Sequence, residues 1–286
     1  MADIPARLIA DIGGTNARFA LVGEDRRPVG ERKLLVRDFP GLVEAARAFL
    51  GAHHVAEAVI AVATPVEGDT VALMNSPWRF SIEAVRRAMG LDRLAVINDF
   101  VAQSLAVTRL GAADLAAIQA GEPHEDRPSV VIGPGTGLGV GILMPDGAGR
   151  RVLPSEGGHA SFAPAGPLET EILRVLQDRF GAVSTERLVS GPGLVNIARA
   201  VAMIRGTSLD VAEPAEVTGR AAAGTCPVCA EALKVFAHAL GAAAGNLVLA
   251  LLARGGVYVT GGLCRRLGPL LDRAALVRGF VAKGRF

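Results

Sequence analysis

Two segments of this chain share one pattern, in which a glycine-rich turn separates two apolar runs. In RLIADIGGTNARFALV the runs are residues 8–12 and 17–22, and in SVVIGPGTGLGVGILM they are residues 130–132 and 140–144. Short apolar runs joined by a tight Gly/Asn turn are typical of β-hairpins. Because the second hairpin follows roughly a domain's length after the first, the repeat predicts two related α/β halves that face each other.

The remaining pattern alternates strands with helices. Strands are predicted at 58–63, at 94–97 and in GVYVTGGL. Helices are predicted at 41–51 and from Asp99 through Leu110. A further helix is predicted to begin after Ser81, which would be its N-cap, with Glu83 in its first turn. LPSEGGHASFAP reads as a loop, followed by helices in ETEILRVLQDRF and STERLVSGPGLVNIARAVA. This alternation places the fold in the α/β class. We expect a small N-terminal α/β domain over 1–109 and a large α/β domain over 110–286.

Composition and charge limit the classes of molecule that the protein is expected to bind. The net charge of +2 and the scattered arginines give no electrostatic case for nucleic acid or for an acidic membrane surface. The start, MADIPARL, does not resemble a signal peptide. The longest uncharged stretch, 235–253, is long enough to span a membrane but contains His238, Asn246 and several alanines, so we expect a buried central helix. These features predict a cytoplasmic protein with no membrane partner.

Three cysteines are present: Cys226, Cys229 and Cys264. An odd number in such a chain argues against a disulfide framework. As a zinc site, the Cys-x-x-Cys of TCPVC lacks a second pair or a nearby His at ligand spacing. As a redox motif it lacks a βα setting, so we expect ordinary free thiols near a helix start.

The glycine turns suit phosphate binding, because glycine lets backbone N–H groups approach a phosphate and threonine adds a hydroxyl. Neither turn fits G-x-G-x-x-G or G-x-x-x-x-G-K-[ST], so a nucleotide would be bound by neither a Rossmann turn nor a P-loop. Asp11 ends the first strand beside the glycine pair. A carboxylate there suits Mg²⁺ ligation through water, and it equally suits a turn cap.

Further polar residues follow apolar segments. Asp99 comes directly after a run that reads as a buried strand, an awkward place for a carboxylate unless it faces a cleft where a ligand bridges the two halves. Glu156 and His159 are brought close by the two glycines of SEGGH. A histidine alone is more often structural than catalytic. Glu186 is predicted at a helix start, where the helix macrodipole alone would favour it.

Several motifs occur in the order seen in the bacterial ATP-dependent glucokinases, which the chain resembles over nearly its whole length. They are IADIGGTNARFAL, MNSPWRFS, VINDFVAQS, GPGTGLGVG, PSEGGHASFAP, ERLVSGPGLVNI, VTGGL and AKGRF. That family belongs to the actin-like ATPase and sugar kinase superfamily, so the resemblance implies two ribonuclease H-like domains with a cleft between them. The cysteine-rich zinc motif near the His in the related repressor/sugar-kinase family is absent here, as is a DNA-binding extension.

The resemblance implies a role for each candidate residue. Asp99 resembles the catalytic base that takes the proton of the glucose 6-hydroxyl. The implied glucose-binding residues are Asn98, Asp99, Glu156, His159 and Glu186. The implied ATP-binding residues are Ala10, Asp11, Ile12, Gly13, Gly14, Thr15, Asn16, Gly135, Thr136, Gly137, Gly261 and Gly262, with Gly261 and Gly262 near the adenosine. An acidic cleft suits a sugar, because each carboxylate accepts two hydrogen bonds.

The implied reaction is the first step of glycolysis, phosphorylation of glucose by ATP with Mg²⁺, in a homodimer. Three alternatives remain: a kinase for another hexose, a sugar sensor without turnover, and an actin-type filament ATPase. Asp99 argues against the sensor, and Glu156, His159 and Glu186 together argue against the filament protein. Glucokinases of this type continue past KGRF with a strand and a Gly-rich helix, and the chain is expected to lack this closing segment, with lower stability and activity as a result.

Overall fold

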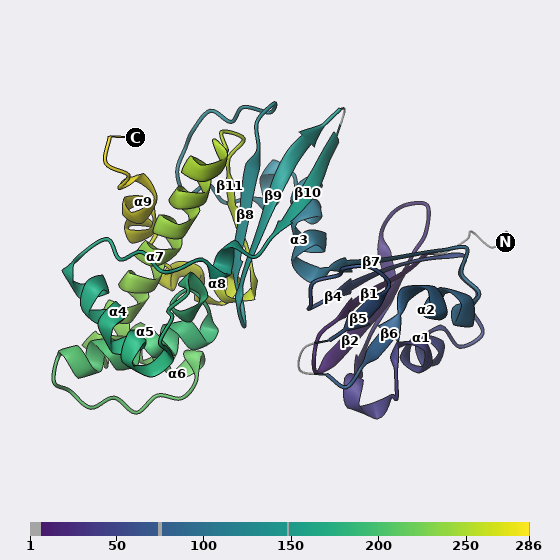
Figure 1. The fold of residues 1–286 in the computed structure, drawn as a ribbon, viewed down its shortest axis with the longest axis horizontal. Helices are drawn as coiled ribbons and strands as arrows, with labels where there is room; N and C mark the ends of the chain where they lie inside the picture. The colour runs from purple at the N-terminus through teal and green to yellow at the C-terminus, as the bar shows by residue number, and fades with distance from the viewer. Residues whose placement is uncertain (1–6, 74–75, 148, 286) are drawn as a thin grey trace. The chain divides into compact units, whose positions relative to one another are not determined.

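The computed structural model describes residues 7–73, 76–147 and 149–285 (Figure 1). Met74 and Asn75 of the MNSPWRFS motif lie outside the described residues. Contacts divide the chain into two compact units, 1–103 and 104–286. The sequence predicted this change at 109/110, within the turns that follow helix α3. Both units are mixed α/β structures.

The first unit contains a five-stranded sheet in the order β3-β2-β1-β4-β7. Its strands are β1 (Arg7–Ile12), β2 (Asn16–Val22), β3 (Pro28–Leu35), β4 (Glu57–Val62) and β7 (Arg93–Asn98). β1 and β2 form the predicted antiparallel hairpin, and β1, β4 and β7 run parallel. The parallel strands therefore end at one edge of the sheet, and this edge carries the polar residues that follow them.

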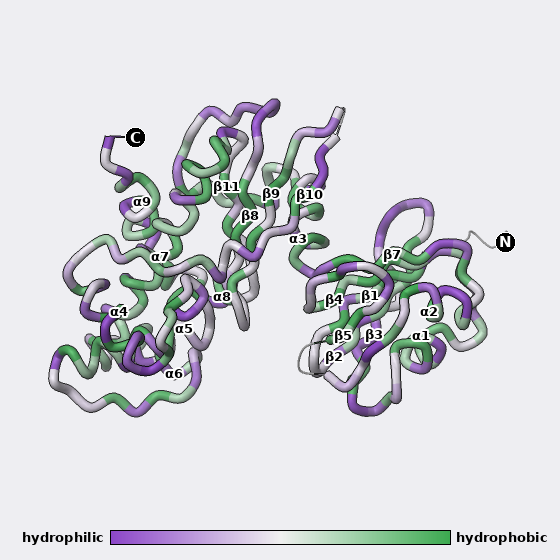
Figure 2. The backbone as a smooth tube through the Cα atoms, in the orientation of Figure 1, coloured by the Kyte–Doolittle hydropathy of each residue, from purple (hydrophilic) through white to green (hydrophobic). Residues whose placement is uncertain are grey.

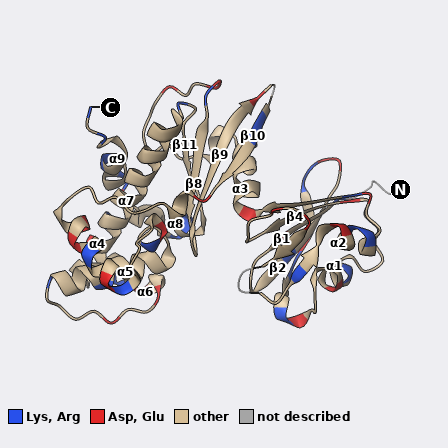
Figure 3. Cartoon of the chain, viewed as in Figure 1, with Lys and Arg blue, Asp and Glu red and all other residues tan. Residues whose placement is uncertain are grey.

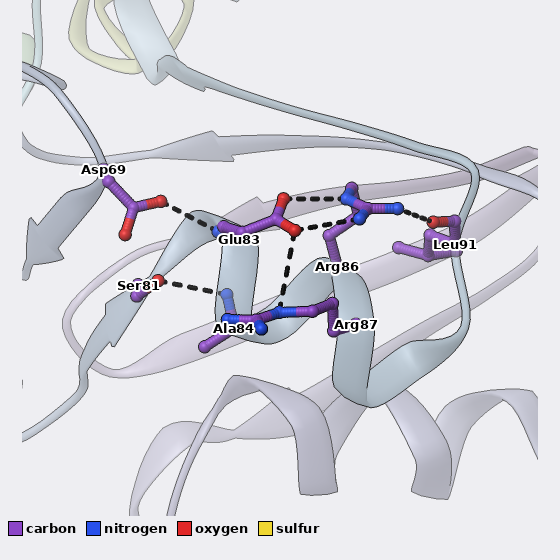
Figure 4. Close-up of polar contacts among 7 residues, drawn as sticks. All are labelled: Asp69, Ser81, Glu83, Ala84, Arg86, Arg87 and Leu91. Carbon is purple, nitrogen blue, oxygen red and sulfur yellow. Dashed lines mark hydrogen bonds and ion pairs between the residues drawn. The ribbon is translucent and has the colours of Figure 1, made fainter.

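Helices α1 (Leu42–Leu50) and α2 (Ile82–Met89) confirm the predicted helices. Before α2, the short strands β5 (Thr70–Ala72) and β6 (Arg79–Ser81) pair with each other. Ser81 accepts a hydrogen bond from the N–H of Ala84, as the predicted N-cap should, and Asp69 accepts one from Glu83 (Figure 4). Glu83 also forms an ion pair with Arg86 at 2.8 Å. Local signals thus specify this helix, and the contacts in Figure 4 are structural.

The second unit has a four-stranded sheet in the order β10-β9-β8-β11. Its strands are β8 (Ser129–Pro134), β9 (Leu138–Asp146), β10 (Gly149–Ser155) and β11 (Val257–Val259). β8 and β9 form the second predicted hairpin, and β11 pairs parallel to β8 on the other side. This repeats the arrangement of β3, β2, β1 and β4, which agrees with the internal repeat in the sequence.

Helix α3 (Asp99–Val107) connects the two units in sequence, because the boundary between them falls within it. The second unit adds α4 (Pro167–Phe180), α5 (Gly191–Ile204), α6 (Pro214–Ala222), α7 (Pro227–Leu251), α8 (Gly262–Leu267) and α9 (Arg273–Val281). α7 packs against α5, α6, α9 and β8.

Helix α7 is the central helix predicted from the long uncharged stretch. It is hydrophobic along most of its length (Figure 2), and among the described residues it is the one helix long and apolar enough to cross a membrane. In its most apolar window, 61% of the residues are buried inside the unit. This burial identifies α7 as a core helix. Lys and Arg are interspersed with Asp and Glu in both units (Figure 3).

Three local predictions were wrong. The predicted helix through Leu110 ends at Val107, and the start of LPSEGGHASFAP is not a loop, because residues up to Ser155 belong to β10. Glu186 does not begin an α-helix. It lies in the single 3₁₀ turn η4 (Thr185–Arg187), and α5 begins only at Gly191. The turn after Val107 ends α3 early, and pairing with β9 makes β10 a strand, so in both cases the surrounding structure overrides the local sequence pattern.

Candidate active site

Asp99 and Asn98 lie where the sequence placed them, at the carboxyl end of a strand. Asn98 is the last residue of β7, and Asp99 is the first residue of α3. Asn98 pairs in register with Val62 of β4, which in turn pairs with Ile12 of β1. Asp11, the next-to-last residue of β1, therefore lies near the same sheet edge as Asp99. The register brings the two carboxylates into one electrostatic environment.

Asp99 is half-buried, and its environment favours the protonated carboxyl. Burial raises the pKa of Asp99 above its ordinary value, and the negative charge of Asp11 raises it further. Hydrogen bonds oppose this shift: the carboxylate accepts the N–H of Phe100 at 2.7 Å and an amide hydrogen of Asn98 at 3.1 Å. The net result is a carboxylate that is more basic than usual, which suits a general base.

The Asn98 side chain orients Asp99 and begins the helix. Its amide oxygen accepts the N–H groups of Phe100 and Val101, at 2.9 and 3.2 Å, as an N-cap does. Its amide nitrogen donates to the carbonyl of Thr64 and to Asp99. Since these four contacts use the polar capacity of the amide, a sugar hydroxyl that bound Asn98 would have to share or replace one of them.

The first glycine turn forms one side of an open pocket of about 250 Å³, lined by Asp11, Gly13, Gly14, Thr15, Asn16 and Arg18. The N–H of Gly13 bonds to the carbonyl of Asn16 and closes the turn. The side chains of Ala10 and Ile12 instead pack in the core. Of the predicted ATP residues in this segment, those two could therefore reach a ligand only through the backbone.

Arg18 is a residue of this pocket that the sequence reasoning missed. Its guanidinium lies 3.4 Å from the Asp11 carboxylate, and both side chains are about half exposed. The signal was available, because a tight hairpin places the residues before and after the turn opposite each other, and Asp11 pairs in register with Arg18. The pocket thus contains one acidic and one basic side chain.

Glu186 lies at the second glycine turn. Its carboxylate accepts the N–H of Leu138 at 2.8 Å, and no Cβ could fit at Gly137 without striking it. The turn itself is closed by a hydrogen bond from the N–H of Gly135 to the carbonyl of Gly137, at 2.7 Å, and Thr136 is exposed at its tip. Glu186, which was predicted to bind glucose, therefore directly contacts the glycine turn that was predicted to bind phosphate.

Gly261 and Gly262 lie at the same end of β8. Gly261 has φ of +93°, which favours glycine, and a Cβ there would meet the carbonyl of Pro134. Gly262 begins α8. The structure thus brings Gly261 close to the start of the second glycine turn, although the two are far apart in sequence.

Glu156 is the N-cap of the 3₁₀ turn η3 (Gly157–His159), and His159 is its last residue. Both side chains are exposed, and His159 Nε2 lies 3.7 Å from Glu156 Oε2. Gly158 packs so closely on Leu138 that it has no room for a Cβ, and the N–H of Thr185 bonds to Ala160 just after η3. These contacts join η3 to η4 and to the glycine turn. Glu156, His159 and Glu186 therefore lie on linked turns of the second unit.

A metal held by several protein side chains is not seen in the described parts of the chain, where no group of three or more His, Cys, Asp or Glu residues is arranged to hold one. A single exposed carboxylate with space beside it remains at Asp11. This arrangement suits an ion that keeps most of its water ligands.

A family model described as Glucokinase matches residues 8–286. The chain belongs to the glucokinase family. The glucokinase of Chromobacterium violaceum is 47% identical over 284 residues, which cover 98% of this chain and 81% of that protein. The glucokinase of Aromatoleum aromaticum is 45% identical over 290 residues, which cover all of this chain and 88% of that protein.

Solved glucokinase structures share this fold. A glucokinase from an Antarctic psychrotroph has a TM-score of 0.88 at 35% identity, covering 98% of this chain and 90% of that one. A ROK family glucokinase from Streptomyces griseus, in complex with glucose and AMPPNP, has a TM-score of 0.64 at 24% identity, covering 96% of this chain and 90% of that one. At that identity the second likeness concerns the fold alone. Membership in the glucokinase family confirms the resemblance inferred from the motifs.

Proposed function

We propose that this chain phosphorylates glucose at its 6-hydroxyl with ATP, giving glucose 6-phosphate and ADP. The observation that carries the proposal is Asp99, a carboxylate of raised pKa held by the α3 N-terminus within the INDF motif of a glucokinase-family chain. A base in this position removes the hydroxyl proton as the oxygen attacks the γ-phosphoryl group of ATP.

Asn98 has a positioning role in this mechanism. Its amide holds both the first turn of α3 and one oxygen of Asp99, which fixes the orientation of the carboxylate that would accept the sugar proton. Fixing the base in this way lowers the entropy lost on reaching the transition state. A sugar hydroxyl that replaces one of its contacts would also make Asn98 a glucose ligand.

Glu156, His159 and Glu186 are proposed to bind the remaining glucose hydroxyls. The exposed side chains of Glu156 and His159 are available to a ligand. Ionised carboxylates accept strong hydrogen bonds from hydroxyl groups, which supports sugar binding. Because Glu186 also accepts the N–H of Leu138, glucose binding and the shape of the second glycine turn are coupled through this one carboxylate.

The two glycine turns are proposed to bind the ATP phosphates. The first supplies the backbone of residues 13–16 and the guanidinium of Arg18, and the second supplies the backbone of residues 135–137. Mg²⁺ fits beside Asp11, where a half-exposed carboxylate lines an open pocket and can bind the ion through water. When bound with ATP, the ion neutralises charge on the phosphates. Gly261 and Gly262 are proposed to lie near the adenosine.

The mechanism needs residues of both units on one pair of substrates. We therefore propose two ribonuclease H-like domains with the substrates in a cleft between them. The shared strand order of the two sheets and the family resemblance support this proposal. By the same resemblance, we propose a cytoplasmic homodimer, which size-exclusion chromatography with light scattering would test.

A coupled assay with glucose, fructose and mannose, each with and without ATP and Mg²⁺, tests the function. The proposal expects turnover of glucose only when both ATP and Mg²⁺ are present. A preference for another hexose would replace glucose as the substrate. Binding of glucose without any turnover would indicate a sensor and refute the proposal.

A further inference from the structure

The Cys-x-x-Cys pair has no part in sugar phosphorylation, yet its geometry is not that of two independent thiols. Cys226 is the N-cap of α7, and its sulfur accepts the backbone N–H of Cys229 at 3.3 Å. Each thiol also shifts the pKa of the other through a side-chain interaction. The two sulfurs therefore face each other across the first turn of a 25-residue helix.

The two thiols differ in exposure in the way that disulfide exchange requires. Cys226 is partly exposed, whereas Cys229 is fully buried in the core of the second unit. An external reagent can reach the first sulfur and not the second. The second sulfur can approach the first without leaving the protein, because the Cys226 sulfur already contacts the backbone N–H of Cys229.

The electrostatic environment separates the two thiols further. Burial raises the pKa of Cys226, but hydrogen bonds from the Cys229 thiol and from the N–H groups of Cys229 and Val228 outweigh it, and the charge of Arg220 adds to them. The net pKa of Cys226 is therefore lowered. Burial and the neighbouring Cys226 raise the pKa of Cys229. A helix N-terminus also favours a thiolate at its cap.

The element before the pair is helix α6, and the absence of a preceding strand was the reason to expect ordinary thiols. A βα connection is not itself what makes a thiol reactive. Reactivity depends on thiolate character and access, and both follow here from the N-cap position.

We propose that Cys226 and Cys229 form a reactive dithiol site that is oxidised reversibly to an intramolecular disulfide by low-molecular-weight disulfides. In the first step the Cys226 thiolate attacks one sulfur of the external disulfide, forms a mixed disulfide and releases one external thiolate. In the second step Cys229 gives up its proton and attacks the Cys226 sulfur, which releases the second external thiolate. The external disulfide is reduced to two thiols, and the two protons of the dithiol pass to them.

Oxidised glutathione, added to the full chain at neutral pH, tests the site by intact mass after alkylation in denaturant. The wild-type protein is expected to lose two alkylatable thiols, to keep Cys264 and to retain no glutathione. The Cys229→Ser variant should stop at the first step and carry one glutathione. The Cys226→Ser variant should be modified at least about tenfold more slowly. Excess dithiothreitol should restore all thiols.

Cys264 provides the matched control, because burial raises the pKa of this thiol to about 12. The Cys264→Ser variant should form the disulfide at the wild-type rate. Circular dichroism melting would establish that each variant is folded, and the same reaction in guanidinium should abolish the difference between cysteines. Equal rates for the Cys226→Ser and Cys229→Ser variants, or a stable mixed disulfide on the wild-type protein, would overturn the proposal. Neither outcome depends on glucose phosphorylation.

Discussion

Replacing Asp99 by asparagine removes the proposed base and little else. The new side chain keeps one oxygen, which can still accept the N–H of Phe100 and the amide hydrogen of Asn98 that now reach Asp99. The other carboxylate oxygen becomes an NH₂ group, which cannot accept a proton from a sugar hydroxyl. The geometry of the α3 N-terminus is therefore preserved while the acid–base function is lost.

Loss of a positioned general base typically lowers the rate by about 10²–10⁴-fold, or roughly 3–5 kcal/mol of transition-state stabilisation. The structure argues for the upper part of this range, because burial and the charge of Asp11 make Asp99 a stronger base than an ordinary aspartate. Glucose affinity should change far less than kcat, since the remaining sugar contacts proposed here lie on Glu156, His159 and Glu186.

The raised pKa also predicts the effects on pH dependence and on stability. Activity needs ionised Asp99, so its loss on acidification should begin at a higher pH than for an ordinary aspartate. For stability the sign is reversed: a carboxyl whose pKa is higher in the folded state opposes folding when it is ionised, and this penalty disappears as the pH falls below its unfolded-state pKa. At neutral pH the Asp99→Asn variant should therefore melt no lower than the wild-type protein.

The assay is steady-state kinetics with glucose and ATP, together with glucose titration calorimetry and thermal melting. Asp38→Asn is a suitable control, because Asp38 is an exposed aspartate of the same unit whose carboxylate lies 3.8 Å from Arg37. The control should keep wild-type kcat. An Asp99→Asn variant that is folded, binds glucose and retains kcat within about twofold would refute the assignment of Asp99 as the base.

Three other perturbations test the rest of the site. Glu156→Gln and Glu186→Gln should each weaken glucose binding by roughly 1–3 kcal/mol per charge-assisted hydrogen bond, and unchanged affinity in both by calorimetry would contradict their role. EDTA should abolish turnover and excess Mg²⁺ should restore it, whereas full activity in chelator would show that Arg18 and the backbone suffice. Gly137→Ala should raise the KM for ATP and lower the melting temperature, because its Cβ would displace the Glu186 carboxylate from the N–H of Leu138; a variant with wild-type KM and Tm would show that the turn can adjust.

Local sequence signals were sufficient for several elements. Both hairpins were predicted because their turn residues and apolar arms are adjacent in the chain. The start of α2 was predicted for the same reason, since Ser81 accepts the N–H of a residue only three positions away. The buried helix α7 was predicted from its composition.

Two edge strands, β3 and β10, were missed because their own residues do not specify them. β3 is almost entirely exposed and reads as a polar segment, and β10 contains two arginines and a proline. Each becomes a strand because the neighbouring strand, β2 or β9, offers unpaired backbone groups to it. Such pairing is a tertiary effect.

The candidate site also has some features that the sequence predicts and others that only the tertiary structure determines. The sequence alone determined which residue types follow the strands, so Asp99, Asp11 and the glycine turns were found from their neighbours. Only the tertiary structure decided their environments: the pKa of Asp99 depends on burial and on Asp11, and the contact of Glu186 with Leu138 joins residues 48 positions apart. The cysteines at 226 and 229 are close in sequence, but the burial of Cys229 comes from the surrounding core. Neighbouring residues determine short-range geometry, whereas burial and the proximity of charges depend on chain segments that meet only in the folded protein.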